Sequence, residues 1–168
     1  MLELGVNYAS PPTGSFLDEQ VVTGVDYVSG LRLATKYTFE NGLMFGREAL
    51  STVYQVKYDG ADYYLIIVPG NFTLGWAWGE DVKYMLEAGL HETATVAMRS
   101  RLSPRNTDHV QLVDSNWFGV AIDWGGSELL GVIFTIRNMS LGIKDIYHTG
   151  YDLNTNEFNF GLGGRVRW

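Results

Sequence analysis

The sequence EFNFGLGGRVRW at positions 157–168 alternates between large apolar residues and polar or small ones. Successive side chains of a β-strand point to opposite faces, so this period of two predicts a strand with one apolar face. The same period runs through most of the chain, and we find no stretch of ten or more residues with an apolar stripe at helical spacing. The protein is therefore predicted to be all-β.

Working outward from this strand, the alternation predicts five more strands at 2–9, 21–39, 43–58, 64–78 and 82–99. Asn41-Gly42 between two of them is a strong hairpin signal, and Gly79 opens another turn. The alternation slips between Phe45 and Leu50, which predicts a β-bulge there.

The segment 110–150 allows two interpretations, because both Gly125-Gly126 and Asn138-Met139-Ser140 suit a turn. In the first, one strand ends at Trp124 and a long strand covers 128–148. In the second, which we prefer, one strand ends near Arg137 and the next covers 141–150. Either interpretation gives eight antiparallel strands joined by hairpins, which predicts a closed up-and-down barrel.

Composition limits the function classes. The 168 residues suit a single domain spanning 1–168, and the absence of cysteine excludes disulfides and thiolate metal sites. A net charge of -7 argues against a nucleic-acid partner. The longest apolar run, 63–68, is far shorter than the roughly 20 residues of a membrane-spanning helix. No secretory signal opens the sequence, so we expect any export signal to have been removed.

The face that opposes the apolar one combines glycine with charges of both signs, which suits the interior of a narrow outer-membrane barrel. Many aromatic residues of the apolar face gather beside the predicted short turns, as in an aromatic girdle. On the strand at 82–99, the first polar residue of the apolar face is Glu92, roughly 25 Å along the membrane normal from the turn. The predicted interior charges are Arg32, Lys36, Glu48, Lys83, Glu87, Arg99, Arg165 and Arg167, and the predicted girdle is Tyr37, Phe39, Phe45, Trp76, Trp78, Tyr84 and Trp168.

Three stretches resemble the lipid A 3-O-deacylase (PagL) family of bacterial outer-membrane barrels. They are YMLEAGL at 84–90, the predicted hairpin at 130–150 and the last strand from Glu157, which also resembles the C-terminal signal of outer-membrane barrels. The resemblance implies an eight-stranded transmembrane barrel in the outer membrane. It also implies a catalytic triad facing the outer leaflet, for which this sequence offers His148, Thr149 and Glu157, with Gly150 where the family has serine.

The first functional hypothesis is an integral outer-membrane barrel with a filled polar interior, acting as a scaffold or partner-binding protein in contact with lipid. The alternatives are a lipid A deacylase-like esterase and a soluble lipocalin-like barrel that binds an apolar ligand. Arg99, Arg101 and Arg105 are candidates to bind lipopolysaccharide phosphates. His91 and Glu87 could form an acid/base pair or belong to a structural ion-pair network. The three histidines lie on separate segments, so neither a metal site nor another cofactor is expected.

Overall fold

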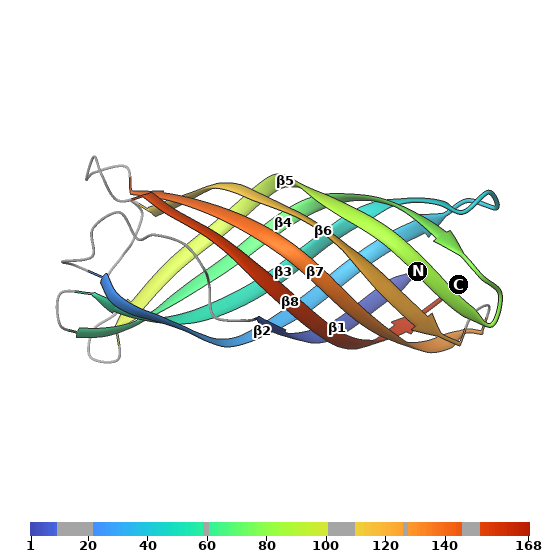
Figure 1. Ribbon diagram of the computed structural model, residues 1–168, viewed down its shortest axis with the longest axis horizontal. Coiled ribbons are helices and arrows are strands. Elements are labelled where there is room, and N and C mark those ends of the chain that lie inside the picture. The colour runs from blue at the N-terminus through green and yellow to red at the C-terminus, as the bar shows by residue number, and fades with distance from the viewer. Residues whose placement is uncertain (10–21, 59–60, 101–109, 126–127, 146–151) are drawn as a thin grey trace.

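The computed structural model describes residues 1–9, 22–58, 61–100, 110–125, 128–145 and 152–168 (Figure 1). Its eight strands form a closed barrel in sequence order, and each strand pairs antiparallel with its neighbours. β1 pairs with both β2 and β8, which closes the sheet and confirms the predicted fold class. The strands are β1 (Leu2–Ala9), β2 (Val22–Thr38), β3 (Leu43–Tyr58), β4 (Ala61–Trp78), β5 (Val82–Ser100), β6 (Val110–Trp124), β7 (Leu130–Asp145) and β8 (Asp152–Val166).

Short turns join the strands at the end of the barrel where both chain termini lie (Figure 1). Gly42, Gly79 and Gly125 each adopt a positive φ, between 91° and 119°, which glycine tolerates at no steric cost. In the first hairpin the Gly42 amide donates to the Phe39 carbonyl at 2.9 Å. The predicted turns at Asn41-Gly42 and Gly79 are confirmed.

The preferred interpretation of 110–150 was wrong, because β6 ends at Trp124 and β7 runs unbroken from Leu130 to Asp145. Residues 138–140 lie inside β7, where Met139 is buried and pairs with Trp117 of β6. Asn138 and Ser140 occupy the opposite face of this strand, so their turn-forming side chains are accommodated without a turn.

The bulge predicted between Phe45 and Leu50 was also wrong. β3 pairs in continuous register with β2 through this stretch, and the irregularities fall beside Val22 and Tyr27 of β2. Alternation is unbroken because Glu48 and Leu50 both point inward, whereas Arg47 points outward. Arg47, a charged residue on the otherwise apolar face, is the reason that the sequence pattern falsely predicted a change of register.

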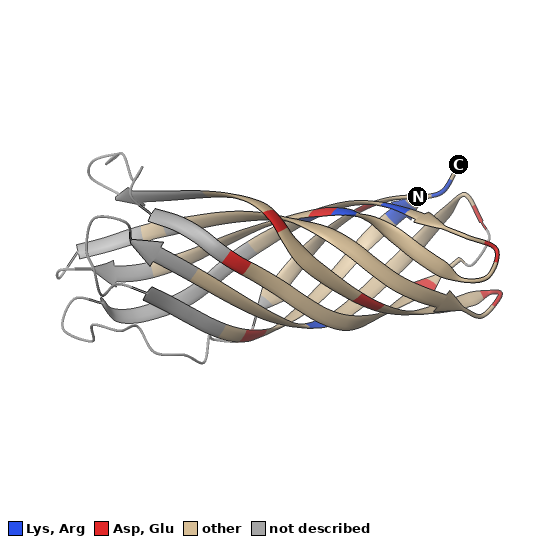
Figure 2. Ribbon diagram, turned by 90° about the horizontal axis from the view of Figure 1, so that it is seen from above, with Lys and Arg blue, Asp and Glu red and all other residues tan. Residues whose placement is uncertain are grey.

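The outer surface of the barrel is largely apolar, whereas its interior combines buried charged side chains with an apolar cluster of Met44, Ala77, Met85, Ala121 and Ile133. Charged residues interrupt the strands at few places, and acidic residues mark the tips of the short hairpins (Figure 2). No helix long and apolar enough to cross a membrane occurs in the part of the chain described here. The predicted girdle residues Tyr37, Phe39, Phe45, Trp76, Trp78, Tyr84 and Trp168 are all exposed.

Candidate functional site

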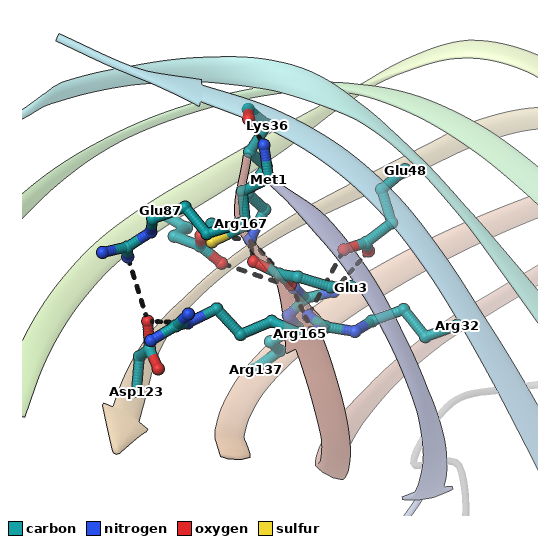
Figure 3. Close-up of polar contacts among 10 residues, drawn as sticks. All are labelled: Met1, Glu3, Arg32, Lys36, Glu48, Glu87, Asp123, Arg137, Arg165 and Arg167. Atoms are coloured by element: carbon teal, nitrogen blue, oxygen red, sulfur yellow. Dashed lines mark hydrogen bonds and ion pairs between the residues drawn. The ribbon is translucent and has the colours of Figure 1, made fainter. Parts of the chain in front are cut away.

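A ring of six buried ionised side chains occupies the barrel interior (Figure 3). Each member points inward because it lies on the face of its strand that opposes the apolar one. The bases and acids alternate around the ring, so three positive charges balance three negative ones. In order of contact the members are Arg32 (β2), Glu3 (β1), Lys36 (β2), Glu87 (β5), Arg137 (β7) and Glu48 (β3).

The contacts around this ion-pair ring are short enough for most to be hydrogen bonds. Arg32 Nη2 lies 2.5 Å from Glu3 Oε2, and Lys36 Nζ lies 3.1 Å from Glu3 Oε1. Glu87 accepts hydrogen bonds from Lys36 and, at 3.4 Å, from Arg137 Nη2. Arg137 also donates to Glu48, whose Oε2 lies 3.6 Å from Arg32 Nη1. Buried charges are tolerated in this way because each has two partners of opposite sign.

A second ion cluster lies near the chain termini. Arg165 Nε lies 2.6 Å from Asp123 Oδ2, and Arg167 Nη2 lies 3.3 Å from the same oxygen. Arg165 also donates to the Glu128 carbonyl of the β6–β7 turn at 2.6 Å. Burial lowers the pKa of the Arg167 guanidinium, and the neighbouring positive charge of Arg165 lowers it further.

Trp117 packs against the ion-pair ring. The Arg137 guanidinium carbon lies 3.8 Å from the centre of the Trp117 ring, which is a cation–π contact. Gly89 of β5 makes room for this indole, because a Cβ at position 89 would lie 2.7 Å from Trp117 Cδ1. The indole and the ring together obstruct the barrel interior.

Glu157, the predicted triad acid, is buried inside the barrel rather than facing outward. Tyr54 Oη donates to Glu157 Oε2 at 2.8 Å, and Asn159 Nδ2 donates to Oε1 at 2.9 Å. His148 and Thr149 lie outside the described residues, so the triad stays a prediction.

Glu87 belongs to the ion-pair ring, whereas His91 bonds to a different residue, so these bonds match the interpretation of Glu87 as part of a structural ion-pair network. His91 Nδ1 lies 2.8 Å from Ser115 Oγ of β6. Asn71 Nδ2 of β4 donates to the Ser115 carbonyl. We refer to His91, Ser115, Asn71 and Asn116 as the β5–β6 junction.

Sequence reasoning found most of the interior charges of the described residues but missed four. Arg32, Lys36, Glu48, Glu87 and Arg165 are buried as predicted, and Lys83 and Arg167 are partly buried. Glu3, Asp123, Arg137 and Glu157 are also buried but were not among the predicted interior charges. The available signal was parity, because each lies on the polar face of its strand.

The structure describes only one of the three arginines predicted to bind lipopolysaccharide. Arg99 lies in β5, one residue before its end, whereas Arg101 and Arg105 lie outside the described residues. Their role stays a prediction. In the described part of the chain no group of three or more histidine, aspartate or glutamate residues is arranged to hold a metal ion.

The exposed apolar surface forms a belt that ends at similar positions on several strands. Leu90 of β5, Phe118 of β6 and Phe158 of β8 are exposed apolar residues. Two residues further from the short turns, each strand presents an exposed polar residue: Glu92, Asn116 and Asn156. Such a band is the surface that a transmembrane barrel presents to lipid.

A closed eight-stranded antiparallel barrel, apolar outside and charged inside, is the architecture of small outer-membrane proteins. No family model and no curated protein matches the sequence.

Among solved structures, the chain is similar to the crystal structure of the outer membrane protein OprG from Pseudomonas aeruginosa. The identity is 12% over 97% of this chain and 93% of that chain, with a TM-score of 0.54. The chain is also similar to the outer membrane protein Ail from Yersinia pestis, at 13% identity over 96% and 97% of the two chains, with a TM-score of 0.38. The likeness to OprG shows a shared fold, that of an outer-membrane barrel.

Proposed function

We propose that the protein is an integral barrel of the bacterial outer membrane that does not conduct and acts by binding a partner protein at its extracellular end. The ion-pair ring carries this proposal. Its six side chains come from five strands and are almost completely buried, and Trp117 packs beside them. An eight-stranded barrel has an interior only wide enough for its own side chains.

A blocked interior leaves the surface as the part of the molecule that can act. Its belt contacts lipid, and several strands extend past the belt at the end opposite the short turns. In outer-membrane barrels the short turns are periplasmic and the other end is extracellular. A partner-binding role therefore places the binding surface at the extracellular ends of the strands.

Ion conductance of the purified barrel in planar bilayers tests this proposal. We expect the wild-type protein to give no current above that of the lipid alone. The matched control is the double variant Arg137→Ala/Trp117→Ala, which empties part of the interior and is expected to give small, flickering currents. Steady single-channel currents from the wild-type protein would contradict the proposal.

A further inference from the structure

The barrel wall between β5 and β6 is paired over only part of its height. Ladder pairs run from Val82↔Trp124 to Gly89↔Trp117, and none of the described residues beyond continues this ladder. β5 nevertheless stays paired with β4 as far as Ser100, and β6 stays paired with β7 from Val110. Each strand therefore has one unpaired edge, and the two strands separate beyond this point (Figure 1).

Where the β5–β6 ladder ends, side chains of the β5–β6 junction bond to the backbone in place of ladder partners. The His91 amide of β5 donates to Asn116 Oδ1 of β6 at 3.1 Å. The Ser115 carbonyl of β6 accepts from Asn71 Nδ2. The first backbone groups without ladder partners are thus bonded to side chains, which ends a sheet without unsatisfied groups.

The part of β5 beyond the junction is exposed on both faces. Glu92 is a bulge residue, because Asn71 of β4 pairs with His91 and the next residue, Gly70, pairs with Thr93. Ala94 pairs with the buried Pro69 and therefore lies on the inward face, yet Ala94 is exposed, as are Glu92, Thr93 and Thr95. In a closed barrel wall the inward side chains would be buried. The wall is therefore open at this level.

The opening lies above the apolar belt. The outward residues at its base are polar, with Glu92 on β5 and Asn116 on β6. β5 continues eight residues past Glu92, which is roughly 20 Å along the barrel axis for a tilted strand. The unpaired edges therefore face water rather than lipid, so a peptide in solution can reach them.

An unpaired edge presents backbone N–H and C=O groups that can pair with another extended chain. Natural edges are commonly protected by lysine or proline, but the sequence TATVAM at 93–98 has neither. Residues 110–116 of β6 pair with β7 but have no ladder partner among the described residues on the side toward β5. The two edges can hydrogen-bond both sides of one inserted strand.

We propose that the opening between β5 and β6 binds an extended peptide segment of a partner protein, which adds as a strand between them. This inference rests on the proposed function and names its binding site. The partly exposed Asp114 on the β6 edge favours a segment with a basic residue. The small side chains of Thr93 and Ala94 leave room for larger ones on the inserted strand. They therefore favour a peptide with β-branched residues at the positions that lie beside Thr93 and Ala94.

The test uses the full chain in lipid nanodiscs and a fluorescent nine-residue peptide of alternating threonine and valine with a lysine at each end. The control peptide has the same side chains but N-methyl groups on alternate residues, which prevent strand pairing. We expect the methylated peptide to bind roughly thirtyfold more weakly, since several backbone hydrogen bonds are lost. Asp114→Asn should weaken binding of the unmodified peptide about threefold, whereas Asp81→Asn at the opposite end of the barrel should not.

The chain has no cysteine, so the binding position can be mapped by disulfide trapping. A peptide with a central cysteine should form a disulfide with Thr93→Cys and Asn116→Cys, but not with Ala88→Cys in the paired wall below. Equal binding of the two peptides, or equal trapping at Ala88→Cys, would overturn the proposal. Dimers linked through Thr93→Cys without trapped peptide would overturn it in favour of a second copy of this chain. Any of these failures in a non-conducting barrel overturns this inference and leaves the proposed function standing. Steady conduction by the wild-type barrel refutes the proposed function, whatever the peptide experiments give.

Discussion

Replacing Glu87 by glutamine removes one negative charge from the ion-pair ring and nearly preserves the side-chain volume. Glu87 accepts from Lys36 and Arg137, so the substitution leaves the ring with one net positive charge. Removing one partner of a buried ion pair typically costs about 3–5 kcal/mol. The equilibrium constant for folding should therefore fall by roughly two hundred to several thousand times.

Glu92→Gln is the matched control, because it makes the same chemical change in an exposed ion pair. Arg47 Nη2 lies 2.7 Å from Glu92 Oε1, and the Arg47 side chain is 73% exposed. Exposed ion pairs contribute about 0.2–1 kcal/mol. The double variant Lys36→Met/Glu87→Gln removes one charge of each sign, so it should be more stable than Glu87→Gln alone.

The assay is reversible urea unfolding in lipid vesicles, followed by tryptophan fluorescence. We expect Glu87→Gln to lower the free energy of unfolding at least three times as much as Glu92→Gln. Equal effects of the two substitutions, or a double variant less stable than Glu87→Gln, would refute the role given to the ring.

Other predictions concern separate parts of the barrel. Gly163→Ala should destabilise the barrel by about 1–3 kcal/mol in the same urea assay, because its Cβ would lie 2.8 Å from Gly5 Cα where β1 meets β8; a neutral effect would contradict this packing. Hydrogen exchange should be fast for about half of the amides of Glu92–Ser100, which lack ladder partners on β6, and slow throughout Val82–Gly89, so equal protection would show that the wall is closed. If the predicted triad is an esterase, lipid A from cells that express the gene should lose an acyl chain by mass spectrometry, and alanine at any triad position should restore it; unchanged lipid A with the wild-type gene would exclude this activity. Glutamine at positions 99, 101 and 105 together should weaken binding of lipopolysaccharide if these arginines contact its phosphates, and unchanged binding would remove that role.

The barrel could be predicted because the sequence pattern that specifies each strand lies within that strand. Each strand has one apolar and one polar face, and this contrast can be read from neighbouring residues alone. Turn glycines such as Gly42 and Gly79 also act locally, through a backbone conformation that other residues avoid.

The errors arose where a local signal had two meanings. Asn138-Met139-Ser140 has turn-forming residues, but the buried partner of Met139 is Trp117, more than twenty residues away. Misplacing this turn also put Arg137 at the end of a strand, so its place in the ion-pair ring was missed. Arg47 gave a false bulge because its partner, Glu92, lies two strands away.

The opening between β5 and β6 was not predictable from the pattern. Residues 93–98 alternate like any other strand segment, and only the register shows that β6 does not pair with them. The end of a ladder depends on contacts such as that between Asn71 and Ser115, which alternation does not encode.

The proposed function requires that the chain forms a closed barrel with its apolar belt in lipid. The most direct test compares gel mobility of unheated and boiled protein after folding into detergent, together with its solubility in plain buffer. We expect a heat-dependent mobility shift and aggregation without detergent, because the apolar belt is then exposed to water. A monomer that stays soluble in plain buffer and shows no shift would contradict this expectation.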